Sequence, residues 1–567
     1  MDNAVITLLE RAAQRCPDRT ALADEYGSWT YREYRETALR IARYIRAEMT
    51  PDTSRRPVAV LIERNAASIV AFMGCAYAGN FYVPLDTGMP VERLRVILEG
   101  LQPAGVIDCR GKIVLQGTNR ENETGGQSDV QAQGRMDEEE RSRWACLLSS
   151  AGVPDCPVVT YREMLEASPA TAQEDDTPGQ EAQCDGRPAA EEIPESALPL
   201  SASQIIDTDP LYAIFTSGST GVPKGVLVSH RSVLDLLSSF AQVFSFDEES
   251  VFGNQAPFDF DVSVKDIYNA LRCCGRVEVI PKRMFVRPNL LIPHLAERGI
   301  NTLIWAVSAV RIIAQFRALD EVKTQKPLKL SYVMFSGEVM PVRALNYYME
   351  RMPQTTFVNL YGPTEITCNC TYKVIDRMYA PDAMLPIGKA FPNTRILLLD
   401  EQNKEIRKPH VTGEICVGGS GLALGYWNAP EKTAESFCQN PGTAMYPDRI
   451  YRTGDLGYYS EDGDLYFASR KDFQIKHMGH RIELGEIEAA LGAIEWIDVS
   501  CCLYDAVKEK IICFYESEKE DRKAIVKSLS ERLPKYMWPN KYIRVESMPL
   551  NAHGKIDRKA LAAMQEK

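Results

Sequence analysis

The chain has 567 residues, of which 45% are hydrophobic and 25% charged, and its formal net charge is -12. This length exceeds what one hydrophobic core usually organises, so we expect two or more domains. An acidic chain offers no long-range attraction for nucleic acid or anionic lipid, and no apolar run is long enough to cross a bilayer. The composition therefore favours a protein that binds small ligands over a nucleic-acid-binding or membrane protein.

The first 19 residues predict an amphipathic helix, because charged residues such as Glu10, Arg11 and Arg15 alternate with apolar ones. They do not resemble a charged leader followed by an apolar signal core. The fifteen cysteines are scattered and form no CxxC pair, which argues against a zinc or dithiol site. Free thiols and the missing leader together predict a cytoplasmic protein.

Strand-like and helix-like patterns alternate along most of the chain. Residues 58–86 combine a short apolar run with a helical pattern, and similar alternation recurs around 226–246 and 277–319. That rhythm predicts an α/β fold, with layered, mostly parallel sheets and helices in a large N-terminal domain spanning residues 1–470.

The regular pattern weakens between residues 110 and 203. From 166 to 200 there are nine acidic residues and one basic one, interleaved with Pro, Ala and Gln. We expect an exposed acidic insertion, interrupted by one strand and helix near residues 158–165. A second boundary follows Arg470, where residues 471–567 show a compact α+β pattern of small-domain size.

The most informative segment is residues 212–230, YAIFTSGSTGVPKGVLVSH. An apolar strand ends in a loop that contains Thr216, Ser217, Gly218, Ser219, Thr220 and Lys224. Phosphate oxygens require many short donors, which glycine backbone N–H groups, hydroxyls and an ammonium supply. The loop is not a Walker A motif, because Gly225 follows Lys224 where that motif has Ser or Thr.

This loop resembles the signature of the adenylate-forming superfamily, which includes acyl-CoA synthetases, luciferases and the adenylation domains of nonribosomal peptide synthetases. Further blocks of that superfamily follow in its order: NLYGPTE (359–365), GEICVGG (413–419) with Gly425-Tyr426, YRTGD (451–455), RKDFQIK (470–476) with GHR (479–481), and NAHGKIDR (551–558). The resemblance covers nearly the whole chain except the insertion.

The resemblance implies roles for the nucleotide-binding residues. Glu365 would coordinate Mg²⁺, in agreement with the preference of that ion for carboxylates near phosphates. Tyr361 would lie against the adenine, Thr364 would reach the α-phosphate, and Asp455 would accept the ribose hydroxyls. The remaining nucleotide-site residues implied in this way are Asn359, Gly362 and Arg470. ATP and Mg²⁺ are thus the expected cofactors.

The resemblance also implies a two-step reaction with a mobile C-terminal domain. Lys555 would bridge the substrate carboxylate and the nucleotide during adenylation, since a placed ammonium stabilises the charge that develops on the phosphoryl group. Asp472 matches the hinge about which the small domain rotates. The loop around Lys476 and Gly479 would then face the site and open a channel for a phosphopantetheine thiol.

The acid to be activated is expected to carry an amino group. Asp261, in FDFDVSVKDI (258–267), matches the aspartate that amino-acid-activating members place against the substrate α-ammonium, and losing one partner of such a pair costs about 2–5 kcal/mol. The chain is particularly similar to D-alanine:carrier protein ligases, although these typically have Cys where this chain has Ser336. The pocket residues implied by position are Asp261, Val262, Lys265, Ile304, Met334, Ser336, Leu360, Cys368 and Asn369.

Lys265 leaves two interpretations open. Pointing inward, its ammonium could pair with an acidic substrate side chain or fill the pocket so that only a small residue fits; pointing outward, it carries no information. We expect a separate phosphopantetheinylated carrier protein as acceptor, because little chain follows the lysine motif. Two alternatives compete with this function: an acyl- or aryl-CoA ligase, and a catalytically inactive nucleotide-binding regulatory protein.

Overall fold

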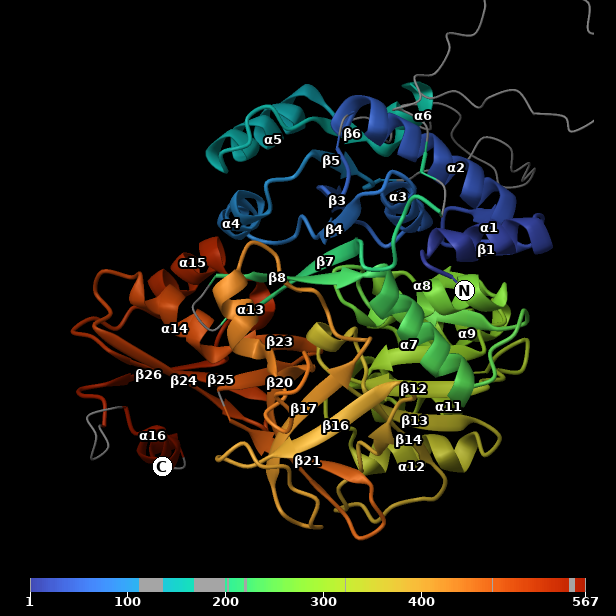
Figure 1. Cartoon of the computed structure of the whole chain (residues 1–567). Helices are drawn as coiled ribbons and strands as arrows, with labels where there is room; N and C mark the ends of the chain where they lie inside the picture. Colours follow the sequence, from blue (N-terminus) through green and yellow to red (C-terminus); the bar gives the residue numbers. More distant parts are fainter. Residues whose placement is uncertain are drawn as a thin grey trace, which may run out of the picture.

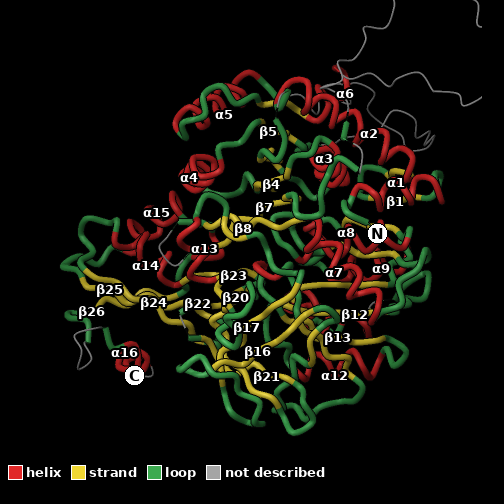
Figure 2. The backbone as a smooth tube through the Cα atoms, in the orientation of Figure 1, coloured by secondary structure: helices red, strands yellow, loops and turns green. Residues whose placement is uncertain are grey.

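The structure is a computed structural model that describes residues 2–51, 53–111, 136–167, 199–200, 203–218, 222–321, 323–471, 473–549 and 556–565. It is an α/β structure with two large sheets and several smaller ones in these residues (Figures 1 and 2). The predicted fold class is confirmed by this arrangement. In the described part of the chain, no helix has both the length and the apolar composition that crossing a membrane requires.

A seven-stranded sheet is built mainly from the N-terminal residues. Its order is β18 (Gly425–Tyr426), β8 (Lys224–Ser229), β7 (Pro210–Thr216), β4 (Phe81–Leu85), β3 (Pro57–Leu61), β5 (Gly105–Asp108) and β6 (Val158–Thr160). Strands from β7 to β6 run parallel, whereas β8 pairs antiparallel with β7 and β18 pairs antiparallel with β8. The predicted strand before the phosphate loop is β7.

A nine-stranded sheet follows in the middle of the chain. Its order is β15 (Lys389–Ala390), β14 (Thr371–Ile375), β13 (Thr356–Tyr361), β12 (Tyr332–Ser336), β11 (Thr302–Ala306), β9 (Val251–Asn254), β10 (Arg276–Val279), β1 (Thr20–Ala23) and β2 (Ser28–Thr30). The strands from β13 to β1 are parallel. Their carboxyl ends therefore meet along one edge, where ligands bind in open α/β sheets.

Helices cover both sheets and connect their parallel strands. They are α1 (Ile6–Arg15), α2 (Tyr31–Tyr44), α3 (Ala66–Tyr77), α4 (Val91–Leu101), α5 (Glu138–Ser150), α6 (Tyr161–Ala167), α7 (His230–Val243), α8 (Val262–Cys273), α9 (Pro288–Glu297), α10 (Val307–Gln315), α11 (Ala318–Glu321) and α12 (Val342–Arg351). Every residue of α3 is buried, as its lack of charged side chains requires. The main core joins α1, α2, α3, α7 and α8 with strands of both sheets.

Residues 136–167 of the expected insertion are described and folded, whereas residues 112–135 and 168–198 lie outside the described residues. The strand and helix anticipated near residues 158–165 are β6 and α6, and α5 precedes them. The sequence did not predict α5, because its apolar residues are few. Trp144 and Leu148, one helical turn apart, are buried and join a core cluster with residues of α4. This part of the insertion therefore packs on the protein instead of lying exposed.

An antiparallel sheet links the large body to the C-terminal residues. It contains β16 (Thr394–Leu399), β17 (Gly413–Gly419), β20 (Arg449–Tyr459), β19 (Phe437–Gln439) and β21 (Leu465–Arg470), with α13 (Pro430–Ser436) between β18 and β19. The hairpin of β22 (Gln474–His477) and β23 (His480–Glu483) follows. Register in β20 and β21 pairs Asp455 with Arg470, so two candidate site residues lie side by side.

The C-terminal residues form an α+β unit with its own core (Figure 1). The three-stranded sheet of β24 (Val499–Asp505), β25 (Lys510–Glu516) and β26 (Lys541–Val545) alternates its side chains between two apolar clusters. Helices α14 (Leu484–Gly492) and α15 (Arg522–Arg532) pack on one face, and α16 (Arg558–Gln565) on the other. A buried ion pair between Arg93 and Glu486 joins this unit to α4.

Candidate active site

One cavity lies where the carboxyl ends of the parallel strands meet the β22–β23 hairpin. Its volume is about 120 Å³. Thr216 and Ser336 are the last residues of β7 and β12, and both line it. Lining residues come from distant parts of the sequence: Met89, Arg93, Ile97, Ile214, Phe215, Thr216, Ser217, Asp259, Phe260, Asp261, Val262, Ser336, Gly337, Gly362, Pro363, Thr364, Cys368, Asp455, Arg470, Gln474, Lys476, Gly479, His480, Arg481 and Tyr536.

The phosphate loop contacts the β22–β23 hairpin at the cavity. Ser217 Oγ donates to the backbone carbonyl of Arg481 at 2.8 Å. The Lys224 ammonium lies 5.0 Å from the ring centre of Tyr426, and burial lowers its pKa. Gly218 is buried beside them, whereas Ser219 and Thr220 lie outside the described residues. Of the described loop residues, Thr216 and Ser217 line the cavity, whereas Lys224 lies beside Thr216 outside that lining.

Glu365 is fully buried in the short helical turn η4 (Thr364–Ile366) and has a partner for each oxygen. Tyr426 donates its hydroxyl to Oε1 at 2.9 Å, and Arg481 Nη1 lies 2.8 Å from Oε2. Burial acts to raise the pKa of Glu365, but the Arg481 guanidinium opposes it and the net pKa is lowered. The carboxylate is therefore kept ionised.

An ionised oxygen donor of this kind fits Mg²⁺, which commonly binds one or two protein carboxylates together with substrate phosphates. Among the described residues, no group of three or more His, Cys, Asp or Glu side chains is arranged to hold a metal by itself. Glu365 is the residue that the sequence predicts for Mg²⁺, and its Oε2 would first have to release Arg481.

Asp455 lines the cavity and contacts two other candidate residues. It accepts a hydrogen bond from the Tyr361 hydroxyl and forms an ion pair with Arg470. Its backbone N–H donates to Thr453 Oγ1 at 3.0 Å within strand β20. The Lys476 ammonium lies 5.8 Å from the ring centre of Tyr361, and burial lowers the pKa of Lys476. Both carboxylate oxygens of Asp455 are thus engaged, one by Tyr361 and the other by Arg470.

Asp261, at the start of α8, lines the cavity with about 9% of its surface exposed. Burial raises its pKa, although a hydrogen bond with Thr364 and the charge of Lys265 act in the other direction. The adjacent Cys368 thiol has a pKa raised to about 12, mainly by burial. A substrate ammonium would stabilise the charged form of Asp261 by supplying an opposite charge in a dry site.

Lys265 points inward. It is fully buried, and its Nζ donates to Asn369 Oδ1 at 2.7 Å. The outward interpretation of this lysine is therefore wrong. Lys265 and Asn369 do not themselves line the cavity but lie behind Asp261 and Cys368. The other predicted pocket residues that are buried behind the lining are Ile304, Met334 and Leu360.

The β22–β23 hairpin forms the remaining wall. Its two-residue turn has positive φ at Met478 (54°) and Gly479 (82°), as the tight hairpin turn that matches strand twist requires. Gly479 N donates to Glu338 Oε1 at 2.7 Å. His480 stacks on Tyr536 at 3.6 Å between ring centres and meets the edge of Phe260 at 4.8 Å. Lys476 and Gly479 both line the cavity.

Not every predicted residue reaches the cavity. Asn359 of β13 donates its side-chain amide to the Pro386 carbonyl at 2.9 Å, which ties this strand to the segment before β15. Asp472 and Lys555 lie outside the described residues. Sequence reasoning did not assign roles to Arg481, Tyr426 or Tyr536. The first two stand inside recognised blocks and could have been found there, whereas no sequence signal marks Tyr536.

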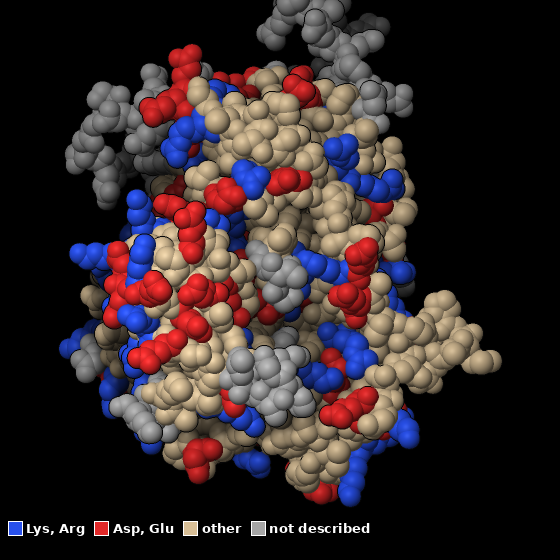
Figure 3. Space-filling model, turned by 90° about the vertical axis from the view of Figure 1, so that its left-hand side faces the viewer, with Lys and Arg blue, Asp and Glu red and all other residues tan. Residues whose placement is uncertain are grey.

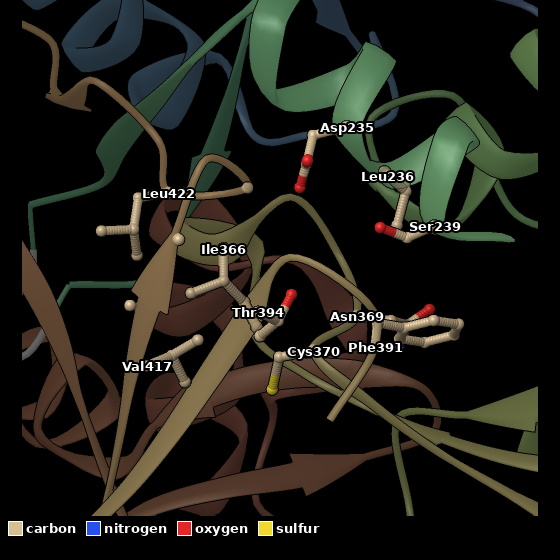
Figure 4. A pocket seen from close by; sticks show the side chains of 13 residues that line it. Asp235, Leu236, Ser239, Ile366, Asn369, Cys370, Phe391, Thr394, Val417 and Leu422 are labelled. Carbon is tan, nitrogen blue, oxygen red and sulfur yellow. The ribbon is translucent and has the colours of Figure 1, made fainter. Parts of the chain in front are cut away.

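A second, smaller pocket lies between α7 and the strands β16 and β17 (Figure 4). Asp235 and Ser239 of α7 face Thr394 and Val417 across it. Its volume of about 10 Å³ leaves room for roughly one water molecule. It includes neither Asp261 nor Asp455, so we assign it no part in the chemistry.

Comparison with solved structures defines the class of fold. The chain superposes on an NRPS protein containing adenylation and PCP domains with a TM-score of 0.74 and 24% identity, covering 99% of this chain and 84% of that one. It also matches an artificially fused adenylation–PCP di-domain NRPS from Klebsiella oxytoca with a TM-score of 0.73 and 20% identity, over 96% and 94% of the two chains. The fold is thus that of adenylation proteins.

The chain belongs to the AMP-binding enzyme family, which matches residues 9–427. It is 31% identical over 572 residues to a D-alanine--D-alanyl carrier protein ligase of Bacillus cytotoxicus, covering 98% of both proteins. It is also 32% identical over 579 residues to a mycosubtilin synthase polypeptide of Bacillus subtilis, of which it spans only 19%. The resemblance to adenylate-forming enzymes inferred from the six blocks is confirmed.

Proposed function

We propose that the protein activates an amino acid with a short side chain, D-alanine or another small one, as its aminoacyl-adenylate. ATP and the amino acid would give aminoacyl-AMP and pyrophosphate, and the aminoacyl group would then pass to the phosphopantetheine thiol of a separate carrier protein. The observation that carries this proposal is the buried Asp261 carboxylate, which lines the same cavity as Asp455 and the phosphate loop. The full-length match to carrier-protein ligases supports it.

Each side of the cavity has a place in the first step. Asp261 would pair with the substrate ammonium and so direct its carboxylate toward the nucleotide. Asp455 would hold the ribose, while Thr216, Ser217 and Lys224 would hold phosphate oxygens. Bound Mg²⁺, held by Glu365, would neutralise phosphate charge. By resemblance, Lys555 would bridge the reacting groups.

For the second step we propose two domains, residues 1–470 and 471–567, joined by a hinge at Asp472. The observed arrangement suits this step, because Lys476 and Gly479 of the hairpin line the cavity. In addition, the Arg481 side chain is paired with the carboxylate of Glu365. Adenylation would take place in a different arrangement that brings Lys555 to the site.

The carrier would approach the side of the molecule that bears the hairpin and the C-terminal unit. Figure 3 shows Lys and Arg interspersed with Asp and Glu on this face. Exposed apolar side chains offer an alternative to charge attraction: Phe473, Met478 and Val507 are 57%, 66% and 94% exposed. We propose docking through these apolar residues in a cytoplasmic setting, with no role for nucleic acid or a membrane.

Amino-acid-dependent pyrophosphate exchange tests the proposed function. We expect exchange with at least one small amino acid, and Asp261→Asn should lower its kcat/KM about 30-fold or more, because the substrate ammonium loses a buried ionic partner. Asp462→Asn removes an exposed carboxylate in the β20–β21 turn and serves as the matched control. Exchange with fatty or aryl acids alone, insensitive to Asp261→Asn, would instead identify an acyl- or aryl-CoA ligase.

A further inference from the structure

The second step of the proposed reaction requires a thiol to lose its proton inside the cavity. The thiolate is the nucleophile, and a thiol of the cysteine type has a pKa of about 8.5. Only a few per cent of such a thiol is therefore ionised at pH 7. A side chain that accepts the proton while the sulfur attacks removes this limit, and groups of this kind typically contribute about 10²–10⁴-fold in rate.

The cationic and weakly acidic groups of the cavity are not suited to accept that proton. Three described arginines of the lining are ion-paired with carboxylates: Arg93, Arg470 and Arg481. The Lys476 ammonium lies over the Tyr361 ring and near Asp455, whose charge favours the protonated form of the lysine. Burial raises the pKa values of Cys368 and Tyr536 to about 12, so both stay protonated at neutral pH.

Asp259 differs from the other two carboxylates in the described lining. Both oxygens of Asp455 are engaged, and Asp261 is the residue that we propose for the substrate ammonium. The Oδ1 atom of Asp259 is buried, and no hydrogen bond from a described residue reaches it. A buried acceptor without a donor is unusual, because burial of polar groups normally comes with hydrogen bonding. Asp259 thus offers a free acceptor atom in the cavity wall.

Asp259 lies where the body of the protein meets the C-terminal residues. It directly precedes Phe260, whose ring packs edge to face against His480 at 4.8 Å between ring centres. His480 in turn stacks on Tyr536, whose hydroxyl group is close enough to Asp259 to feel its charge. The carrier is proposed to approach from the side of the hairpin and the C-terminal unit, so a thiol that enters beside His480 would meet Asp259.

The charges around Asp259 support a role as proton acceptor at neutral pH. Burial raises the pKa of its carboxyl group to about 7, and the charge of Asp86 acts in the same direction, whereas Lys282 and Arg64 oppose both effects. A proton acceptor is most effective when its pKa lies near the working pH. Burial lowers the pKa of the adjacent His480 to about 4, which makes this imidazole the weaker base of the two.

We propose that Asp259 is a catalytic residue of the thiol-transfer step, in which its Oδ1 atom accepts the proton of the phosphopantetheine thiol. This inference rests on the proposed function. As the proton moves, the sulfur forms a bond to the carbonyl carbon of the aminoacyl-adenylate. The bond from that carbon to the phosphate oxygen breaks with its electron pair, and AMP leaves. Because Asp259 as a whole is partly exposed, the proton can then pass to solvent.

Single-turnover transfer to pantetheine over a range of pH tests this assignment. The protein is first loaded with aminoacyl-adenylate from ATP, Mg²⁺ and an amino acid that supports pyrophosphate exchange. Wild-type transfer should rise with pH around a midpoint near 7, because only the ionised carboxylate accepts a proton. Asp259→Asn should slow transfer at pH 7 about 10²-fold or more, and its remaining rate should rise only toward the thiol pKa of about 8.5.

Asp86→Asn is a second variant that leaves Asp259 in place. The Asp86 charge helps to raise the pKa of Asp259, so its removal should move the midpoint of transfer to lower pH. The amide oxygen can still accept the hydrogen bond from Gly88 N. A purely structural role for Asp259 would produce no such shift. Asp462→Asn, in the exposed β20–β21 turn, is the matched control and should keep the wild-type rate and midpoint.

Pyrophosphate exchange separates this inference from the function beneath it. Asp259→Asn should lower exchange much less than transfer, since adenylation involves no thiol. An equal loss of both, or a wild-type profile without a rise near pH 7, would overturn the assignment. If thermal unfolding shows that Asp259→Asn folds poorly, the wild-type and Asp86→Asn profiles decide.

Failure of the proposed function would appear differently, as a lack of exchange with every amino acid. If a fatty or aryl acid supports exchange instead, the same transfer assay with that acid still tests Asp259. No exchange with any acid would overturn both the proposed function and the role of Asp259.

Discussion

At the scale of single residues, burial determines which side chains are charged around the cavity. Glu365 stays ionised because Arg481 opposes the effect of burial, whereas the pKa of the neighbouring Cys368 thiol is raised to about 12. The sequence identified Asp261, Ser336 and Cys368 as pocket residues, and all three line the cavity. The sequence could not distinguish these lining residues from Ile304 and Met334, which are buried behind the lining. That difference depends on packing between distant strands.

His230 provides a prediction at this scale that is independent of the active site. It begins α7, is about 2% exposed, and its Nδ1 accepts a hydrogen bond from Val5 N at 3.2 Å. Burial lowers its pKa to about 4. Unfolding restores the ordinary pKa of about 6.5, so the unfolded chain binds the extra proton and stability falls as pH decreases from about 6.5 toward 4. At pH 5 this linkage costs about 2 kcal/mol.

Urea unfolding at pH 7.5 and 5.0 measures this effect. His230→Gln should reduce the acid-induced loss of stability by about that amount, since glutamine does not titrate. His410→Gln changes an exposed histidine, with 60% of its side chain accessible, and should keep the wild-type loss. Equal acid sensitivity of His230→Gln and wild type would show that His230 is not the titrating group.

At the scale of elements, the β22–β23 hairpin brings the C-terminal residues to the cavity. Its turn residues Met478 and Gly479 both have positive φ, which the Met-Gly pair in the sequence permits because glycine adopts this conformation readily. Three contacts seat the hairpin: Ser217 with the Arg481 carbonyl, Gly479 with Glu338, and Arg481 with Glu365. The last contact buries an ion pair, and removing one partner leaves an uncompensated charge.

From the contacts of the β22–β23 hairpin we expect the loss of Arg481 to affect the two steps of the proposed reaction differently. Arg481→Ala should slow transfer to the carrier thiol about tenfold or more, because the docked arrangement loses its buried ion pair. Pyrophosphate exchange should fall much less, since adenylation would use the other arrangement. Single-turnover transfer and exchange assays measure the two steps separately.

Arg311→Ala is the matched control for this prediction. It breaks the ion pair with Glu509, which also links the body to the C-terminal unit but is 34% and 47% exposed. Exposed pairs contribute little, so both steps should keep wild-type rates. An equal loss of exchange and transfer in Arg481→Ala would contradict the assignment of the hairpin to the second step.

At the scale of the whole molecule, the insertion combines two kinds of sequence. Residues 138–167 form α5, β6 and α6, which extend the seven-stranded sheet and its helical cover. Trp144 of α5 is about 6% exposed within the core cluster that also contains α4. The acidic stretch beyond it, rich in Pro and Gln, has the composition of a segment that cannot form a core.

We therefore expect changes in the acidic stretch and changes in α5 to affect the stability of the protein differently. Replacing residues 170–196 by a Gly/Ser linker of about ten residues should leave the unfolding midpoint and activity unchanged, because loop length contributes weakly to stability. Trp144→Ala should lose about 3–5 kcal/mol, as expected for truncating a large buried aromatic. Urea unfolding followed by circular dichroism measures both. A large destabilisation by the linker would show that the acidic stretch packs on the protein.

The sequence by itself determined the family and the α/β class and proposed the nucleotide-site candidates, because these depend on ordered local motifs and on the periodicity of apolar residues. Only the tertiary structure decided that Lys265 points inward, that Arg481 pairs with Glu365, and that Asn359 ties β13 to the segment before β15. These facts depend on contacts between residues as much as 116 positions apart, which no local pattern encodes. Burial of such pairs, and the charge balance that burial demands, arises only when the sheets and the C-terminal unit come together.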